Sequence, residues 1–445
     1  MSVPVRHSAT SAKVVQAYRF ALDQTPRDER GCWSHAGASR FAWNWGLAKC
    51  NERYQAEGKW YSAFDLQKLW NAEKKVRPEL AWWSENSKCV YQEAFRDLDR
   101  ALRAFVASKK GQRKGRKLGF PKFKKRGRCR DSFRFSTAGG PICCSGRTVT
   151  LPRLGTIRTH ESTRKLARRL ENGTARILSA TVSRTAQRWY VSFIVEVERA
   201  IPERHARAAS AIGIDLGVKA LLTGVDDAGN VIRIPGPKPF RASLRKLRRA
   251  SQAHSRKKPG SANRRKSAAR LGRIYARVTN VRADALHKAT TDLVRRYEVV
   301  AAEDLNVAGM VRNRRLARAV TDQGLGTAVR MLGYKTTWNG GRLVLADRWF
   351  PSSKTCSACG TVKAKLSLSE RVFHCDSCGL AMDRDENAAR NLLKLALAAS
   401  GADRVNACGG TVRPRPARQD PLKQEPGTAD AGETGTASGQ LGAAA

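Results

Sequence analysis

Several features that would assign the chain to other classes of protein are missing from its 445 residues. No run of about 18 apolar residues is present, which excludes a membrane-spanning helix. The N-terminal stretch MSVPVRHSATSAKVVQAYRF lacks the apolar core and the cleavage site of a secretory signal. No internal repeat occurs either. We therefore expect a soluble, cytoplasmic protein with no membrane partner, long enough for two to four domains.

Acidic residues are scarce. The chain has 38 Asp and Glu against 84 Lys and Arg, a formal net charge of +46 at pH 7. Such an excess implies a polyanionic partner, and nucleic acid is the first candidate. Residues 109–130, KKGQRKGRKLGFPKFKKRGRCR, contain no acid and include Phe120 and Phe123. This stretch fits a solvated basic loop and a surface that tracks phosphates and stacks on bases about equally well.

A disulfide framework is also missing. The eleven cysteines are an odd number, and seven of them follow no disulfide-like rhythm: Cys32, Cys50, Cys89, Cys129, Cys143, Cys144 and Cys408. The other four form two pairs, CSAC and CDSC, in the pattern C-x2-C-x15-C-x2-C: Cys356, Cys359, Cys375 and Cys378. This spacing predicts a tetrahedral four-thiolate zinc ribbon, and two disulfides are disfavoured in a reducing compartment. Because all four positions are filled, the zinc should be structural.

The first half of the chain combines strand and helix signals. VVQAYRFAL (14–22) alternates like a strand, and strand signals return after residue 131. Between them, two helical stripes are expected in the core: Trp43, Leu47 and Tyr54, then Phe95, Leu98, Leu102 and Phe105. We expect a small β-barrel or sandwich with a helical insertion.

The pattern changes at residue 206. Three strands in AIGIDLGVKALLTGVDDAGNVIRIP, a long basic helix, the strand YEVVAAEDL, a helix over about 322–339, the strand GRLVLADRWF and a helix at DENAARNLLKLALAA follow one another. The long helix should bury one stripe: Leu271, Ile274, Val278, Val281, Ala285 and Leu293. This order predicts an α/β domain.

Three carboxylates lie at edges of the predicted elements. Asp215 is in the strand IGIDLG, where an unpaired charge is costly, and Glu303 ends the apolar strand of VVAAEDLN. Asp385 begins the last helix, where the helix dipole favours a negative charge. A single acid at a strand end is usually a turn residue. Three in this order predict a site for two Mg²⁺ or Mn²⁺ ions, which hydrolyse phosphodiesters by activating water and stabilising the leaving oxygen.

The motifs resemble those of the TnpB family of insertion-sequence proteins. They are YRFAL, SRFAWNWGLA, FRDLDRALRAF, GIDLGVKALLT, RRYEVVAAEDLNVAGMVRN, WFPSSKTCSACG, VFHCDSCG and DRDENAARNLL, in the family's order. The resemblance implies an RNA-guided DNA endonuclease with a RuvC-like (RNase H-like) domain, related to type V CRISPR effectors. It places the catalytic acids at Asp215, Glu303 and Asp385 rather than Asp383. One departure, TDQGLGTAV before LGYKTTW, predicts a local packing change only.

The resemblance also implies partners and a domain order. Expected partners are a guide RNA and a double-stranded DNA target with a short adjacent motif, for a monomer or dimer in a bacterium or archaeon. A transposase that joins DNA ends, or an RNA-guided repressor, are the alternatives, because one fold supports several outcomes. We expect an α+β multidomain chain: a β-barrel (1–25 and 126–205), a helical recognition insertion (26–125), a RuvC-like nuclease domain (206–350 and 383–400), a zinc-ribbon insertion (351–382) and a disordered tail (401–445).

Overall fold

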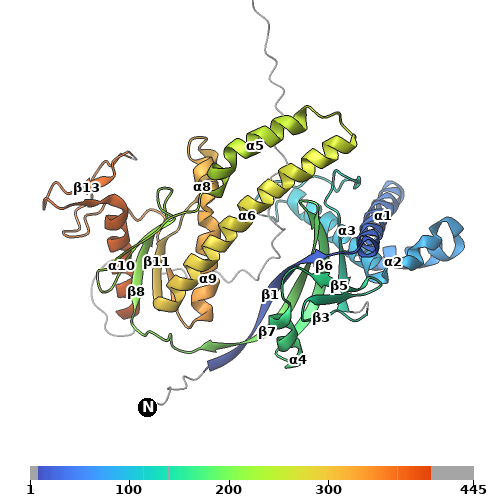
Figure 1. The fold of residues 1–445 in the computed structure, drawn as a ribbon, viewed down its shortest axis with the longest axis horizontal. Helices are drawn as coiled ribbons and strands as arrows, with labels where there is room; N and C mark the ends of the chain where they lie inside the picture. Colours follow the sequence, from blue (N-terminus) through green and yellow to red (C-terminus); the bar gives the residue numbers. More distant parts are fainter. Residues whose placement is uncertain (1–8, 114, 138–139, 368, 402–445) are drawn as a thin grey trace, which may run out of the picture.

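The computed structural model of the protein describes residues 9–113, 115–137, 140–367 and 369–401 (Figure 1). We call residues 9–202 the N-terminal lobe and residues 211–401 the C-terminal lobe. Each lobe has its own sheet and hydrophobic core. The tail predicted for 401–445 lies outside the described residues except for Gly401. In the described part of the chain, no helix is both long and apolar enough to cross a membrane.

The N-terminal lobe contains a seven-stranded antiparallel sheet in the order β2-β6-β7-β1-β5-β4-β3. Strand β1 (Ala9–Asp23) is longer than the predicted 14–22 and pairs along most of its length with β7 (Arg188–Pro202). No backbone pairing between described residues joins the edge strands β2 and β3, so a closed barrel stays a prediction. The remaining strands are β2 (Ser132–Ser136), β3 (Cys143–Ser145), β4 (Thr148–Leu151), β5 (Gly155–Thr159) and β6 (Ala175–Thr185).

Helices inserted between β1 and β2 pack against this sheet. Helix α1 (Pro26–Glu57) begins with a capping box between Thr25 and Asp28 and ends at Gly58, whose φ of 67° suits glycine. The predicted stripes are buried at Trp43, Leu47, Phe95, Leu98 and Leu102. Tyr54 is wrong as a core residue: it is 49% exposed and stacks on Trp60. The other elements are α2 (Ala63–Val76), η1 (Pro78–Glu85), α3 (Lys88–Lys109) and, after β5, α4 (Arg164–Glu171).

The basic segment 109–130 is held against these helices. Trp43 Nε1 donates to the Lys122 carbonyl over 3.0 Å, and the Asn44 side chain exchanges hydrogen bonds with the Lys124 backbone. Phe120 packs edge-on against Phe105, so it belongs to the packing of the lobe, whereas Phe123 is 51% exposed. The segment is therefore an anchored basic surface, in which Phe123 is the more exposed ring and Phe120, at 38%, is exposed in part.

The C-terminal lobe contains a five-stranded sheet in the order β10-β9-β8-β11-β12. Strands β8, β11 and β12 are parallel, whereas β9 and β10 are antiparallel to their neighbours. This arrangement confirms the three predicted strands of residues 211–235 and the two later strands, and it adds that these two run parallel to β8. The strands are β8 (Ala211–Asp215), β9 (Leu222–Asp226), β10 (Val231–Ile234), β11 (Val299–Glu303) and β12 (Arg342–Ala346).

Helices cover both faces of this sheet (Figure 1). Ile212 and Ile214 of β8 face the core shared with α6 (Ala262–Arg296) and α9 (Leu325–Trp338). Ala211 faces the core of α10 (Arg384–Gly401) on the opposite side. A helix was predicted over 322–339, but Gly324, with φ 72°, divides it into α8 (Ala317–Gln323) and α9. The short α7 (Val307–Arg312) precedes them.

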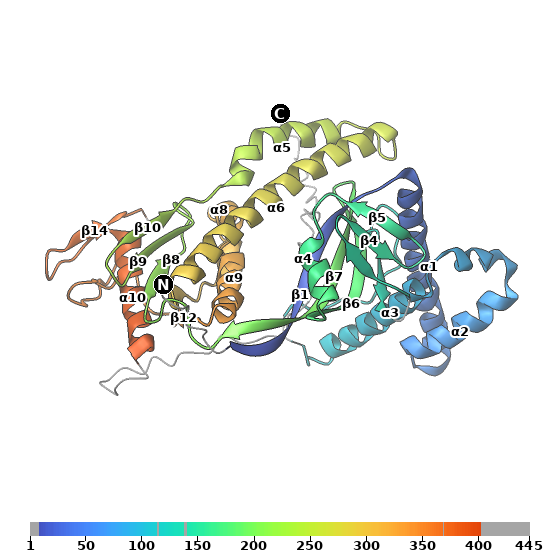
Figure 2. The ribbon, with the colours of Figure 1, turned by 60° about the horizontal axis from the view of Figure 1, so that its bottom comes forward.

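The basic hairpin of α5 (Pro239–Ser255) and α6 extends from this lobe toward the N-terminal lobe (Figures 1 and 2). The predicted stripe on α6 is buried at Ile274, Val278 and Leu293. Val281 is wrong as a core residue, being 40% exposed, and Leu286 is buried in its place. A small two-stranded sheet of β13 (Val372–His374) and β14 (Ala381–Asp383) precedes α10.

Candidate active site and metal centre

Two of the predicted acids end neighbouring parallel strands. Asp215 is the last residue of β8 and Glu303 is the last residue of β11. The register pairs Ile214 with Ala302. Asp215 and Glu303 are the next residues on these two parallel strands, so they are neighbours at the same edge of the sheet. Ligands of open α/β sheets bind at the carboxyl ends of the strands, where these side chains lie.

The third acid comes from α10, which rests directly on β8. A Cβ atom added at Gly213 would lie 2.1 Å from the Leu393 backbone nitrogen, so only glycine permits this contact. The contact is made by residues 389–393 of α10, and the helix extends from there back to its first turn, where Asp385 lies. The carboxylate of Asp383 accepts hydrogen bonds from the backbone nitrogens of Asp385 and Glu386, at 3.0 and 3.2 Å. Asp383 is thus occupied in capping the helix.

The pKa of Asp215 depends on its burial and on the charges of the other two acids. Burial, and then the negative charges of Glu303 and Asp385, raise the pKa of Asp215 to about 8. Like charges close together disfavour ionisation, and a cation between them would reverse that effect. The three carboxylates do not form a single-ion cluster: in the described part of the chain, only the four cysteines bring ligand atoms within 4.8 Å of one another as a group of His, Cys, Asp or Glu.

The neighbouring acids have other partners. Asp304, next to Glu303, forms an ion pair with Arg348 over 2.8 Å. Glu386, next to Asp385, is paired with Arg233 of β10 and with Arg390 one turn along α10, both at 3.0 Å. After burial, the charges of Glu303 and Asp385 raise the pKa of Asp215 most, and the charge of Asp383 raises it less.

Sequence reasoning missed a set of polar residues that holds Glu303. The buried hydroxyl of Ser352 donates to Glu303 Oε1. Asn391 of α10 donates to the Ser352 carbonyl over 2.8 Å and to the Thr355 carbonyl over 2.7 Å. Asn387, one turn earlier, donates to the same Thr355 oxygen and accepts from the Ser357 nitrogen. The spacing of the two asparagines, four residues apart on one helix face, was the available signal.

The TDQG segment, where a local packing change was predicted, makes hydrogen bonds to two other parts of the C-terminal lobe. Both carboxylate oxygens of Asp322 accept from the backbone nitrogens of Phe240 and Arg241, which caps the start of α5. The fully buried Gln323 donates to the Val218 carbonyl over 2.9 Å, in the turn that follows Asp215. The end of α8 therefore joins the start of α5 to the turn beside the acids.

The four predicted zinc ligands meet at one point. The sulfur atoms of Cys356 and Cys378 are 3.6 Å apart, and those of Cys359 and Cys375 are also 3.6 Å apart. These distances exceed a disulfide bond of about 2.0 Å. They match tetrahedral sulfurs around zinc, because Zn–S bonds of about 2.3 Å place the sulfurs about 3.8 Å apart. The donor set therefore fits zinc.

Each CxxC pair lies in a tight turn. The Gly360 nitrogen donates to the Cys356 carbonyl, and the Gly379 nitrogen donates to the Cys375 carbonyl. Both glycines have positive φ, 81° and 72°. Hydrogen bonds from Thr361 lower the pKa of Cys359 to about 6. A thiol with a lowered pKa gives up its proton to a metal more readily.

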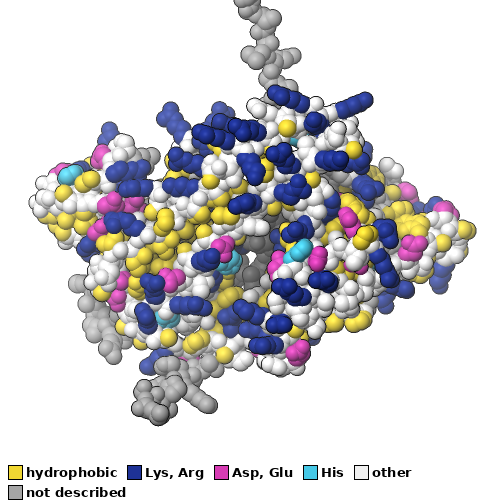
Figure 3. Space-filling model, in the orientation of Figure 1, with side chains coloured by type: hydrophobic (Ala, Val, Ile, Leu, Met, Phe, Trp, Pro, Cys, Tyr) yellow, Lys and Arg dark blue, Asp and Glu magenta, His cyan; other side chains and the backbone are white. Residues whose placement is uncertain are grey.

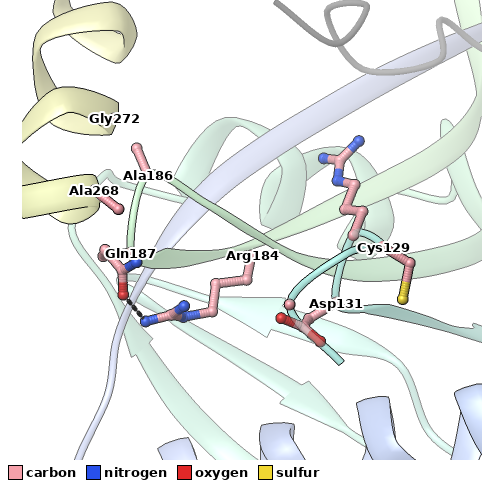
Figure 4. A pocket seen from close by; sticks show the side chains of 9 residues that line it. Cys129, Asp131, Arg184, Ala186, Gln187, Ala268 and Gly272 are labelled. Atoms are coloured by element: carbon pink, nitrogen blue, oxygen red, sulfur yellow. Dashed lines mark hydrogen bonds between the residues drawn. The ribbon is translucent and has the colours of Figure 1, made fainter. Parts of the chain in front are cut away.

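Basic side chains cover much of the face shown in Figure 3, both over the α5–α6 hairpin and across the N-terminal lobe. A pocket of about 340 Å³ lies where α6 meets the N-terminal lobe, lined by Arg130 and Arg184 among others (Figure 4). The Arg184 guanidinium donates to Gln187 and lies 4.8 Å from the Trp33 ring centre. Gly272 of α6 closes the pocket against the β6–β7 turn, because an added Cβ would approach Ala186 Cα to 3.3 Å. The pocket lies between the lobes, is lined by two arginines and by Asp131, and does not include Asp215, Glu303 or Asp385.

The fold and site together define a mixed α/β protein with acids at the carboxyl edge of parallel strands and a four-cysteine cluster. Residues 192–314 match the OrfB_IS605 family model, described as "Probable transposase", and residues 326–392 match "Cas12f1-like, TNB domain". Residues 14–59 match a "Helix-turn-helix domain" model, although here this segment is most of β1 and one continuous helix, α1.

Relatives and solved structures add further similarities. A "Putative RNA-guided DNA endonuclease" of Mycobacterium tuberculosis is 38% identical over 85% of this chain and 86% of the relative. InsQ of Escherichia coli, with the same description, is 32% identical over 94% of this chain and 100% of InsQ. The structure of Cas12f1 with guide RNA and target DNA covers 85% of this chain and 98% of Cas12f1, at 14% identity and a TM-score of 0.48. The chain belongs to the TnpB (OrfB) family.

Proposed function

We propose that this protein is an RNA-guided DNA endonuclease that hydrolyses phosphodiester bonds at Asp215, Glu303 and Asp385. The observation that carries the proposal is geometric: Asp215 and Glu303 end the neighbouring parallel strands β8 and β11, and α10, which has Asp385 in its first turn, packs directly on β8. The names of the relatives at 32% and 38% identity support the same activity.

The three carboxylates would hold the divalent cations, because hard oxygen ligands suit Mg²⁺ and Mn²⁺. Bound there, such ions activate water and stabilise the leaving oxygen of a phosphodiester. The chain's own residues prepare this site. Ser352 orients Glu303, Asp383 fixes the first turn of α10, and Asn391 holds the backbone that carries Ser352. Such supporting hydrogen bonds restrict the rotamers that a ligand carboxylate adopts.

Zn²⁺ would be bound by Cys356, Cys359, Cys375 and Cys378, in a closed four-thiolate site with a structural role. The hydrogen bonds of Asn387 and Asn391 to residues 355 and 352 connect the folded cysteine segment to α10. Zinc binding would therefore stabilise the same backbone that positions Glu303. We assign residues 351–382 to a zinc ribbon and residues 206–350 with 383–400 to a RuvC-like nuclease domain.

The positive charge has a use in this function, because a guide RNA and a DNA duplex are both polyanions. Base pairing with the guide would select the DNA sequence, while the protein contacts the backbone and a short motif beside the target. We assign residues 1–25 with 126–205 to a wedge-like β domain and residues 26–125 to nucleic-acid recognition. The basic pocket between the lobes and the anchored segment 109–130 supply phosphate-binding surface.

The experiment that tests this function is purification of the full chain with its bound RNA. We expect a defined RNA to copurify, and DNA cutting to require that RNA, Mg²⁺ or Mn²⁺, and a matching target. Binding should weaken steeply with salt, because each phosphate contact releases counterions. DNA cutting that is indifferent to RNA removal would contradict the proposal.

A DNA-joining transposase is the second candidate, favoured by the description of the matching family model. The same acids would serve both reactions, so the site does not separate them. Strand-transfer assays on DNA that carries the element's ends separate them: joined products support the transposase, and cut ends alone support the nuclease. An RNA-guided repressor would bind the target and leave it intact.

A further inference from the structure

One tryptophan differs from the rest in its exposure. Trp349 is 86% exposed, whereas the other nine tryptophans of the chain are buried or partly buried. Single exposed hydrophobic residues are common on protein surfaces and need no function. The inference therefore depends on how the chain holds this side chain and where it lies.

The backbone on both sides of Trp349 is fixed. The Trp349 nitrogen donates to Asp347 Oδ1 over 2.9 Å, and the Phe350 nitrogen donates to the Asp347 carbonyl over 3.0 Å. Arg348 is paired with Asp304, and the ring of Phe350 packs into the core beneath α10. The chain thus anchors both neighbours of Trp349 and leaves its indole in solvent.

The loop that carries Trp349 leaves the sheet at the edge where the acids lie. It follows β12, whose last residue, Ala346, is paired in register with Glu303. Three residues after Trp349, Ser352 donates its hydroxyl to Glu303. One short turn therefore links the indole to a carboxylate of the candidate active site.

The surroundings select the ligand by charge. Arg348, which is paired with Asp304, precedes the indole, and Lys354, whose ammonium donates to the Ala364 carbonyl, follows in the same segment. An aromatic face beside cations is the arrangement that binds single-stranded nucleic acid, since bases stack on the ring while cations neutralise phosphates. In a duplex the faces of the bases are covered by their neighbours, so only an unpaired or extruded base can use this ring.

We propose that Trp349 is a base-stacking platform that holds one unpaired nucleotide of the DNA strand about to be cut. The inference rests on the proposed nuclease function and adds a positioning residue to it. It predicts that the strand enters the acid site as single-stranded DNA, with one base on the indole and the adjacent backbone directed toward the carboxylates.

The first test uses the purified protein with its copurified RNA, and compares Trp349→Ala, Trp349→Phe and the wild type. A matched control is Val15→Ala, because Val15 is also an exposed hydrophobic residue, at 39%, but lies on β1 in the other lobe, outside residues 26–125. We expect kcat/KM of Trp349→Ala to fall about 10- to 100-fold on single-stranded DNA, the range expected for one lost base stack. Trp349→Phe should retain most of the activity, and the activity of Val15→Ala should equal that of the wild type. Cutting by Trp349→Ala at the wild-type rate overturns the inference.

A second comparison separates base stacking from a general structural role. Single abasic nucleotides are placed in turn along the cut strand. At one position the abasic site should slow the wild type by the same factor as Trp349→Ala, and should not slow Trp349→Ala further. If an abasic nucleotide slows the wild type and Trp349→Ala equally at every position, the inference is overturned. Unchanged Tm of Trp349→Ala is expected, because the side chain is exposed.

A binding measurement keeps the inference distinct from the nuclease proposal. In the Asp215→Ala background, a single-stranded DNA with 2-aminopurine at successive positions should show fluorescence quenching at one position, lost in Trp349→Ala. The inference is overturned if the fluorescence is quenched in an RNA strand and not in the DNA. It is also overturned if the Trp349→Ala substitution leaves the quenching unchanged. A change of oligomeric mass in Trp349→Ala would also overturn it by assigning the ring to an interface between copies. If the wild type cuts no DNA at all, the proposed function fails, and this measurement still decides on Trp349.

Discussion

The two candidate metal sites of this protein are built in opposite ways. The four cysteines come from one stretch of 23 consecutive positions, Cys356 to Cys378, and their sulfurs already lie at zinc-binding distances. The acids come from two strands and a helix, and the charges of Glu303 and Asp385 raise the pKa of Asp215. A local turn can assemble the first site, whereas only the packed sheet assembles the second. The acid site therefore depends on the tertiary fold more than the cysteine site does.

The largest effect is expected from removing an acid. Asp215→Ala should lower the rate of DNA cutting by at least about a thousandfold, because a cation ligand is lost, while binding of nucleic acid is retained. Asp304→Ala should keep most of the activity, since the carboxylate of Asp304 is held by Arg348. Cleavage assays and filter binding on both variants check this. Equal loss in the two variants would contradict the assignment of roles among these acids.

A large effect on structure is expected at the cysteines. Cys356→Ser should remove bound zinc and unfold the segment locally, because binding of a structural zinc and folding are coupled. Metal analysis and amide hydrogen exchange over 351–382 measure both. Cys143→Ser, at an exposed cysteine outside the cluster, is the control. Full zinc content in Cys356→Ser would show that this cysteine is no ligand.

An intermediate effect is expected where the two sites meet. Ser352→Ala removes the hydrogen bond to Glu303 and should lower kcat or the affinity for Mg²⁺ by about 10- to 100-fold, as such supporting partners commonly do. Titration of cutting against Mg²⁺ measures it. Ser352→Thr keeps a hydroxyl and should recover part of the loss. Activity of Ser352→Ala equal to that of the wild type would remove Ser352 from the site.

The smallest effect is expected on stability. The pKa of Asp215 is raised from 3.8 to about 8, so the folded state holds a proton that the unfolded state releases. In the absence of divalent cations, stability should therefore fall as pH rises from about 4 to about 8 and then level off. Asp215→Asn should flatten this decline and raise Tm by a few degrees near pH 8, as expected where function places charges in conflict. Thermal melts from pH 4 to 9 check this, and a wild type without such a decline would contradict it. Added Mg²⁺ should restore the stability that the wild type loses as the pH rises.

Much of the fold could be predicted because its signals are local. The strands that carry Asp215 and Glu303 are apolar runs, and the helix at DENAARN has a regular periodicity. The errors occurred where tertiary contacts replaced a local pattern. Tyr54 continues a helical stripe but extends past the core to stack on Trp60, and Gly324 breaks a helix that periodicity alone would continue. The closed barrel stays a prediction, because it concerns strand pairing over long distances, which no local pattern encodes.

The sequence by itself determined the cysteine cluster, the excess of positive charge and the family, because each is a property of residue type and spacing. It did not determine the roles of adjacent acids from their chemistry alone, since Glu303 and Asp304, or Asp383 and Asp385, are equivalent as isolated carboxylates. Only the tertiary structure separated them, by pairing Asp304 with Arg348 and using Asp383 as a helix cap. The physical reason is that a charge acts through its surroundings, and packing brings those surroundings from distant parts of the chain.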